Sequence, residues 1–216
     1  MIELRGYIDE NGKKRFAEWL EELDAAAAAK VTIALARLEQ GNFSNAKGVG
    51  AGVFEYKIDF GPGYRIYFGK DGESVVILIG GGTKKRQQQD IATAPDVLGR
   101  LQAEKEAGEP VMPLTHDFKE TIRARAQRDP AFRQALLRES VECILNGDLE
   151  TGKSVLRDYV NATVGFQKLE QRTRIPAKSL MRMLGPKGSP SVANLSSILT
   201  ALQKSEGVHF ELSLRH

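Results

Sequence analysis

A charged stretch with no large apolar residue, at positions 102–110, divides this chain into two parts. The stretch reads QAEKEAGEP, so it has little to bury in a core, and it ends in glycine and proline, which often interrupt regular structure. A chain of 216 residues has room for a domain on each side of it. We therefore expect one domain over residues 1–108 and a second over residues 112–216.

The two parts differ in net charge. Residues 1–111 hold 15 lysines and arginines against 17 acidic residues, a net charge of −2, whereas residues 112–216 hold 16 against 11, a net charge of +5. A positive excess of this size suits a nucleic-acid partner, but many proteins without such a partner share it. Charge alone therefore favours nucleic-acid binding by the second part without establishing it.

Simple features disfavour several classes of protein. The chain has no run of 18 apolar residues and does not begin with a basic run followed by an apolar core, so we expect a cytoplasmic protein with no membrane partner. Cys143 is the single cysteine, and its helical apolar surroundings predict a buried structural thiol rather than a nucleophile. His116, His209 and His216 are too scattered for a metal site, and we expect no metal and no cofactor.

The first part is expected to be an α+β domain, a helix pair with an antiparallel sheet. A strand is predicted over residues 2–8, followed by two helices, the second over residues 25–40 with Asp24 as its N-cap. At Val53 the apolar period changes from helical to alternating, which is typical of strands. The strands predicted in this alternating region are residues 53–60, 64–68 and 75–79.

The turn between the first two of these strands sets their register. A three-residue loop at residues 61–63 places apolar side chains opposite apolar ones, for example Ile58 opposite Ile66. The same register places Asp59 opposite Arg65 on the less apolar face of the sheet. The segment that follows the last strand is then expected to lie just beyond the Arg65 end of its neighbour.

That segment is basic, and it makes Arg65 a candidate functional residue. Lys84, Lys85 and Arg86 follow the last strand and are expected to converge on Arg65. A simpler interpretation leaves Arg65 in a surface salt bridge with Asp59 and the other three cations on a solvated helix start. Both interpretations remain open on the sequence.

The second part is expected to be all-helical, and residues 165–185 have the form of a helix-turn-helix. A short helix, a turn at residues 174–176 and a second helix with Leu180 and Met183 inward make up this motif. Side chains at the start of the second helix would read base edges and phosphates. The candidate DNA-binding residues are Lys178, Ser179, Arg182, Lys187, Ser191 and Asn194. The alternative is a three-helix core whose outer face is polar because it is solvated.

Two runs in the second part resemble the XRE-like (HigA-like) antitoxins encoded beside RelE/ParE-type toxins. They are DLETGKSVLRDYVNAT at residues 148–163 and PAKSLMRMLGP at residues 176–186. The first part resembles the phage-derived, HigB-like branch of the toxin superfamily, through GPGYRIYF at residues 61–68 and GGGTKKRQQQDI at residues 80–91. The resemblance implies a toxin and its antitoxin joined in one chain.

For the first part, the resemblance implies a helix pair on a sheet that binds the ribosome and cuts mRNA. Arg65 matches the strand arginine of the ribosome-dependent RNases, and Lys84 or Lys85 matches their basic residue after the last long strand. Lys57 stands where other members carry an arginine, and Tyr67 is the candidate for the tyrosine of the best-studied relatives. Fixed Arg and Lys donors stabilise the charge that builds when a ribose 2′-OH attacks its own 3′-phosphate, and a lysine crowded by other cations is a candidate base.

For the second part, the resemblance implies a repressor that binds the operator DNA of its own promoter and docks on the toxin, within or between chains, as a homodimer or larger assembly. The helices of residues 117–145 are the expected docking surface, and the alternating residues 208–214 are a second, strand-like contact. Two alternatives remain open. The first part could inhibit gyrase without catalysis, or it could be the inactive half of a DNA-binding regulator.

Overall fold

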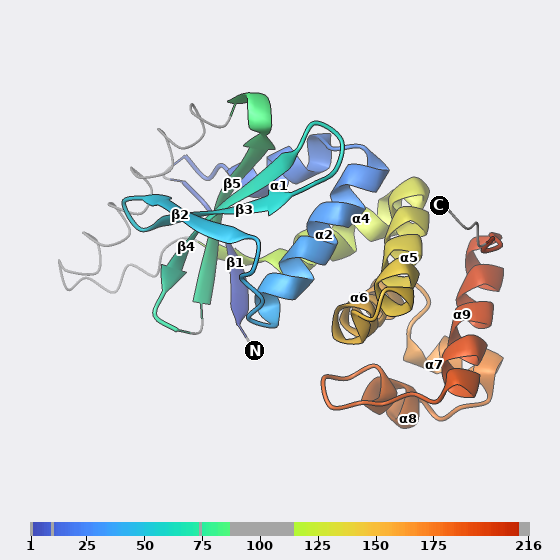
Figure 1. Cartoon of the computed structure of the whole chain (residues 1–216). Coiled ribbons are helices and arrows are strands. Elements are labelled where there is room, and N and C mark those ends of the chain that lie inside the picture. Colours follow the sequence, from blue (N-terminus) through green and yellow to red (C-terminus); the bar gives the residue numbers. More distant parts are fainter. Residues whose placement is uncertain (1, 10, 74, 87–114, 212–216) are drawn as a thin grey trace, which may run out of the picture. The chain divides into compact units, whose positions relative to one another are not determined.

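Six strands form one sheet in the computed structural model of this chain, which describes residues 2–9, 11–73, 75–86 and 115–211 (Figure 1). With eight α-helices in the described residues, the protein has a mixed α+β fold. The chain divides into two units, Met1–Ile122 and Arg123–His216. The boundary expected between residues 108 and 112 lies outside the described residues, and residues 115–122 belong to the first unit.

The sheet is mixed rather than antiparallel throughout. Its strands are β1 Glu3–Tyr7, β2 Ala46–Gly50, β3 Val53–Ile58, β4 Tyr64–Asp71, β5 Val75–Thr83 and β6 Thr115–Asp117, in the order β2-β3-β4-β5-β1-β6. Strands β2 to β5 form an antiparallel meander, but β1 pairs with β5 in parallel. The prediction of a purely antiparallel sheet is therefore wrong. The physical reason is that two helices carry the chain from β1 to the far edge of the sheet before the meander begins.

These two helices, α1 Arg15–Glu22 and α2 Ala25–Glu39, confirm the predicted helix pair. The carboxylate of Asp24 caps α2 by accepting the N–H of Ala27 at 2.8 Å, as the sequence predicts. The Trp19 ring of α1 lies so close to Gly81 of β5 that a methyl group there would overlap it. Position 81 therefore faces the helices. The register of β4 with β5 shifts between Tyr67 and Phe68, which interrupts the alternation of faces at residue 79, so Tyr67, Ile77 and Ile79 lie together on the face that turns away from the helices.

The loop between β3 and β4 is longer than predicted. Ile58 pairs with Tyr64, so the loop spans residues 59–63 instead of 61–63, and the register differs by two residues. Gly61 and Gly63 both take positive φ angles, 53° and 77°, which favours the longer turn. Because the error is an even number of residues, every side chain keeps its predicted face while its partner changes.

The new register changes the neighbours of Arg65. It lies opposite Lys57 on β3 and Gly82 on β5, and the predicted pairing with Asp59 is wrong. Strand β5 also continues to Thr83, beyond its predicted end at residue 79. The basic segment after β5 nevertheless begins next to the end of β4, as expected.

The second unit is helical in the residues described. Its helices are α4 Phe118–Arg128, which begins in the first unit, α5 Pro130–Leu145, α6 Leu149–Ala162, α7 Phe166–Thr173, α8 Ala177–Met183 and α9 Val192–Glu206. Leucines from α6, α7, α8 and α9, namely Leu156, Leu169, Leu180 and Leu202, are fully buried. Cys143 on α5 is buried, as predicted. Among the helices described, none is both long and apolar enough to cross a membrane.

In this chain, the described part of the segment expected to make a strand-like contact, residues 208–211, is not a strand. After Gly207, the backbone N–H of Val208 bonds the carbonyl of Gln203, and the N–H of Phe210 bonds the Gln203 side chain at 2.8 Å. These bonds fold residues 208–210 back onto the end of α9, and residues 212–216 lie outside the described part.

Candidate functional site

Arg65 lies in the interior of the first unit, paired with a carboxylate. Its Nε is 3.4 Å from Oε1 of Glu55 on β3, and the two side chains are only 5% and 2% exposed. Its Nη1 donates to the carbonyl of Tyr64 at 3.0 Å. Arg65 is therefore neither an exposed cation nor part of a surface salt bridge with Asp59.

Glu55 is a residue of this site that the sequence interpretation missed. Its carboxylate lies 3.5 Å from the ammonium of Lys47, which faces it from β2. Lys47 is 64% exposed, so the buried carboxylate links one buried and one exposed cation. An acidic residue in the alternating strand was visible in the sequence. Its burial was not, because β2 was not predicted.

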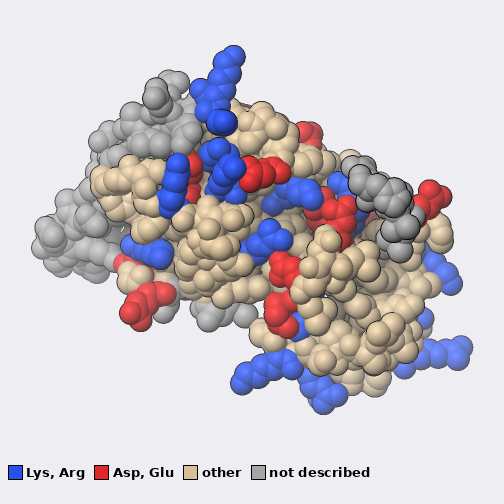
Figure 2. Space-filling view, in the orientation of Figure 1, with Lys and Arg blue, Asp and Glu red and all other residues tan. Residues whose placement is uncertain are grey.

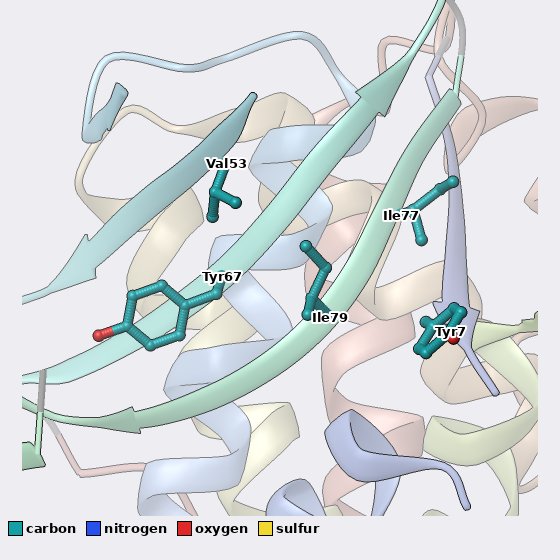
Figure 3. Close-up of a cluster of buried hydrophobic side chains, with 5 residues drawn as sticks. All are labelled: Tyr7, Val53, Tyr67, Ile77 and Ile79. Atoms are coloured by element: carbon teal, nitrogen blue, oxygen red, sulfur yellow. The ribbon is translucent and has the colours of Figure 1, made fainter. Parts of the chain in front are cut away.

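Lys57 and Tyr67, both proposed from the sequence, have different environments. Lys57 is exposed, lies opposite Arg65 and forms an ion pair with Asp59 at 2.6 Å. Tyr67 is 2% exposed and belongs to an apolar cluster on the sheet face that turns away from α1 and α2. The side chains of this cluster come from four strands and are Tyr7, Val53, Tyr67, Ile77 and Ile79 (Figure 3). Tyr67 therefore serves the core in this structure.

Lys84 meets Arg65 at Gly63. Its backbone N–H donates to the Gly63 carbonyl at 2.8 Å. A Cβ atom at Gly63 would lie 3.4 Å from Nη1 of Arg65 and 3.6 Å from Cβ of Lys84. Lys84 and Lys85 are exposed in a short 3-10 turn, Lys84–Arg86, and the Arg86 side chain lies outside the described part.

The charges around Arg65 suit a bound anion. Five cations and two carboxylates lie on the strands and the turn around this position. The cations are Lys47, Lys57, Arg65, Lys84 and Lys85, and the carboxylates are Glu55 and Asp59. The cations outnumber the carboxylates, so a phosphate approaching from the exposed lysines meets a positive potential. The guanidinium is held in a fixed orientation by its carboxylate and carbonyl partners.

In the second unit, two short helices, α7 and α8, meet at a turn where the sequence predicts a helix-turn-helix. Helix α7 ends at Arg174, which takes a left-handed conformation with φ of 59°, and α8 follows after Pro176. Lys178 and Arg182 on α8 are exposed, and Ser179 is half-buried. Lys and Arg side chains project from the end of this unit that carries α8 (Figure 2). The outward face of α8 is therefore basic.

The residues after α8 divide into an exposed cation and a structural pair. Lys187 is exposed in the loop. Ser191 is the N-cap of α9, where its Oγ accepts the N–H of Asn194 at 3.2 Å. The Asn194 side-chain amide donates to the sulfur of Met183 at 3.3 Å. Ser191 and Asn194 thus use these polar groups to anchor α9 beside α8.

Lys153 on α6 is a second residue that the sequence interpretation missed. It is 1% exposed, and its ammonium donates to the carbonyl of Gly188 at 2.5 Å and to Glu150 at 2.7 Å. A methyl group at Gly188 would overlap the last carbonyls of α8, those of Arg182 and Met183. The loop that carries Lys187 is therefore held against α8 on one side and against α6 on the other.

Comparison with known proteins gives one informative match. The chain is 42% identical over 80 residues to an uncharacterized protein of Haemophilus influenzae, and the aligned residues make up 37% of this chain and 81% of that protein. No family model matches the chain, and no solved structure matches it. The name of the Haemophilus protein states no activity, so it assigns none to this chain.

Proposed function

We propose a function for this chain from the premise that it belongs to the same family as the uncharacterized protein of Haemophilus influenzae. The proposed function is that of a type II toxin–antitoxin module in one chain. Its first unit is a RelE/ParE-like, ribosome-dependent mRNA endoribonuclease. Its second unit inhibits the first and represses its own promoter by binding operator DNA.

The observation that carries this proposal is the approach of Arg65 and Lys84 to the same glycine, Gly63. The guanidinium of Arg65 is held on a strand, and the backbone of Lys84 is held by the turn that follows the next strand, so both residues start from fixed positions beside Gly63. Donors that need no reorganisation stabilise a developing phosphorane most effectively. Because Gly63 has no side chain, nothing at this position separates the phosphate of a bound RNA from the two cations.

The proposal gives roles to five of the nearby charged residues. Lys84 or Lys85 accepts the proton of the ribose 2′-OH as its oxygen bonds to the 3′-phosphorus, and Arg65 with the remaining lysine stabilises the phosphorane. The P–O5′ bond then breaks, leaving a 2′,3′-cyclic phosphate, and the released 5′-oxygen takes a proton from the lysine that accepted one or from water. Lys57 binds the message backbone. Glu55 is a positioning residue, because it touches Arg65 and holds its orientation. Tyr67 has no part in the proposed reaction because it is buried in the apolar cluster.

For the second unit, the exposed cations of α8 and its loop support the DNA-binding proposal. In this proposal Arg182 hydrogen-bonds the acceptor edge of guanine in the major groove, and Lys178 and Lys187 neutralise phosphates. Two copies are needed for useful specificity, because one recognition helix covers only a few base pairs.

Expression of residues 1–122 in bacteria tests the RNase proposal. This fragment is preferred to residues 1–108 because β6 and Phe118 belong to the first unit. The expected result is growth arrest with RNA 5′ ends inside translated messages. Arrest should disappear in Lys84→Ala and persist in a control, Lys13→Ala, which removes another exposed lysine of this unit. Broken DNA in place of cut RNA would favour gyrase as the target.

A second candidate function is that of a DNA-binding regulator whose first unit is inactive. The burial of Arg65 against Glu55 favours it, because an arginine neutralised by a carboxylate has less charge to offer a phosphate. Under this alternative, a folded 1–122 fragment causes neither arrest nor RNA cleavage, while DNA binding by the full chain is unaffected.

A further inference from the structure

Strand β6, which comes from much later in the chain, pairs with the outer edge of β1. Arg5 pairs with Asp117, Gly6 with His116 and Tyr7 with Thr115, all antiparallel. In addition, Nη1 of Arg5 donates to Oγ1 of Thr115 at 3.3 Å. Without β6, the described part of the sheet would end at β1, with unpaired N–H and C=O groups that accept an added strand.

At the centre of this pairing, a large side chain, His116, lies against a residue without one, Gly6. The His116 ring lies over Gly6, and a methyl group at Gly6 would overlap the ring. On its other side, Nε2 of His116 is 3.1 Å from the hydroxyl of Thr121 on α4. The glycine thus provides the space that the histidine occupies.

The start of α4 extends the contact onto the helix pair. Phe118 packs edge-on against Phe16 of α1, with ring centroids 5.9 Å apart, and both side chains are almost fully buried. Lys119 forms an ion pair with Glu39 at the end of α2, at 3.2 Å. Ile122, one turn after Phe118, is 5% exposed. Backbone pairing, an aromatic contact and an ion pair therefore all serve one short segment.

We propose that the β1 edge and the adjoining surface of α1 and α2 form a docking site for residues 115–122, and that this docking holds the two parts of the chain together without a covalent link. The occupant is an extended Thr-His-Asp triplet that runs into a helix beginning with phenylalanine. A separate polypeptide with the same segment would occupy the site in the same way.

The docking site lies away from the cations around Arg65. Strands β5 and β1 separate β4 from β6, which at the spacing of neighbouring strands is about 14 Å. Gly6, beneath His116, pairs with Leu78 and shares the sheet face that carries α1, whereas Arg65 is on the other face. Residues 115–122 in this site therefore do not cover the Arg65 face.

The test is a full chain with a protease site inserted between residues 100 and 101, cut after folding and examined by size-exclusion chromatography with mass measurement. The two fragments are expected to elute as one complex. Phe118→Ala should raise their dissociation constant about 100-fold or more, because it leaves Phe16 without its partner. Gly6→Ala should also weaken the complex. A matched control, Gly48→Ala on the opposite edge strand β2, should not, because nothing lies within 4 Å of a methyl group there.

A competition with a peptide of residues 115–124 needs no substitution and decides the case if a variant fails to fold. In excess, this peptide should displace the helical fragment from the cut chain, while the same residues in scrambled order should not. Separation of the unsubstituted fragments would overturn the proposal. So would a complex that Phe118→Ala, Gly6→Ala and the peptide all leave unchanged. None of these measurements depends on RNA cleavage, so loss of the proposed activity cannot be mistaken for loss of docking.

Discussion

Nε of Arg65 lies 3.4 Å from a carboxylate oxygen of Glu55, and both side chains are almost completely withdrawn from solvent. A buried ion pair contributes less net stability than its Coulomb energy suggests, because both ions have lost their hydration. Removing one partner is nevertheless costly, because the other ion is left buried and poorly compensated. Arg65, which the resemblance makes the leading candidate for catalysis, therefore also has a structural role.

This pair predicts that Arg65→Ala lowers the free energy of unfolding of the first unit by about 3–5 kcal/mol. The change removes the buried cation partner of Glu55, whereas Lys47, which also pairs with Glu55, is exposed to solvent. Urea denaturation followed by the fluorescence of Trp19, the single tryptophan, measures the effect on this unit. Lys13→Ala, which breaks an exposed pair with Glu18, should change stability by less than about 1 kcal/mol. Equal stabilities of the two variants would contradict the structural role of Arg65.

On the second unit, Arg182→Ala should weaken binding to the preferred operator by about 1–3 kcal/mol and relax sequence choice. Lys187→Ala should instead weaken binding to all sequences and reduce the salt dependence of log K by about one. Titration of cognate and scrambled duplexes at two salt concentrations separates these effects. If Arg182→Ala changes neither affinity, α8 does not lie in the DNA groove.

Lys153 predicts a link between the interior of the second unit and its DNA contacts. Lys153→Met should cost about 1–3 kcal/mol of stability, because it leaves the Gly188 carbonyl without its buried donor. Because this bond holds the loop, Lys153→Met should also remove the contribution of Lys187 to DNA binding. In the Lys153→Met background, Lys187→Ala should then weaken DNA binding no further. Lys204→Met, at an exposed position of α9, serves as the control. A full Lys187 effect in both backgrounds would restrict Lys153 to a stabilising role.

His116 predicts that pairing of β6 with β1 weakens in mild acid. Burial, and secondly the charge of Lys14, hold the pKa of His116 below its ordinary value of 6.5, while Glu120 and Asp117 act in the opposite direction. The unfolded histidine therefore binds a proton more readily than the folded one, so its contribution to stability is present above pH 6.5 and is lost as the pH falls below that value. Hydrogen exchange of the β1 and β6 amides, corrected for its intrinsic pH dependence, should accelerate between pH 7.5 and 5.5. His116→Gln should abolish this acceleration.

The periodicity of apolar residues predicted most of the elements of this fold. It failed at β2 and β6, whose sequences AKGVG and THD have no sustained alternation of apolar and polar residues. Each is a strand because a neighbouring strand offers unpaired backbone groups. The β3–β4 register was wrong for a different reason, since two glycines with positive φ allow a loop longer than the pattern of apolar pairs required.

The candidate site was predictable in its charges and not in its burial. The approach of Lys84 to Arg65 follows from strand order and survives an error of two residues in register, because the basic segment adjoins the same strand end in both. The interior position of Glu55 depends on the neighbouring strands β2 and β4, and that of Lys153 on the loop that carries Gly188. A charged residue in a strand or helix gives no local sign that its partner is a buried arginine or a loop carbonyl.

The most direct test of the central claim uses purified residues 1–122 and one mRNA, presented either on translating ribosomes or free of them. The proposed function predicts cuts within the translated message, no cuts in the free message, and loss of cleavage by about 100-fold or more in Lys84→Ala. Circular dichroism should confirm that the variant is folded, since Lys84 is exposed. A folded fragment that leaves the translated message intact, or that cuts equally well after Lys84→Ala, would contradict the proposed function.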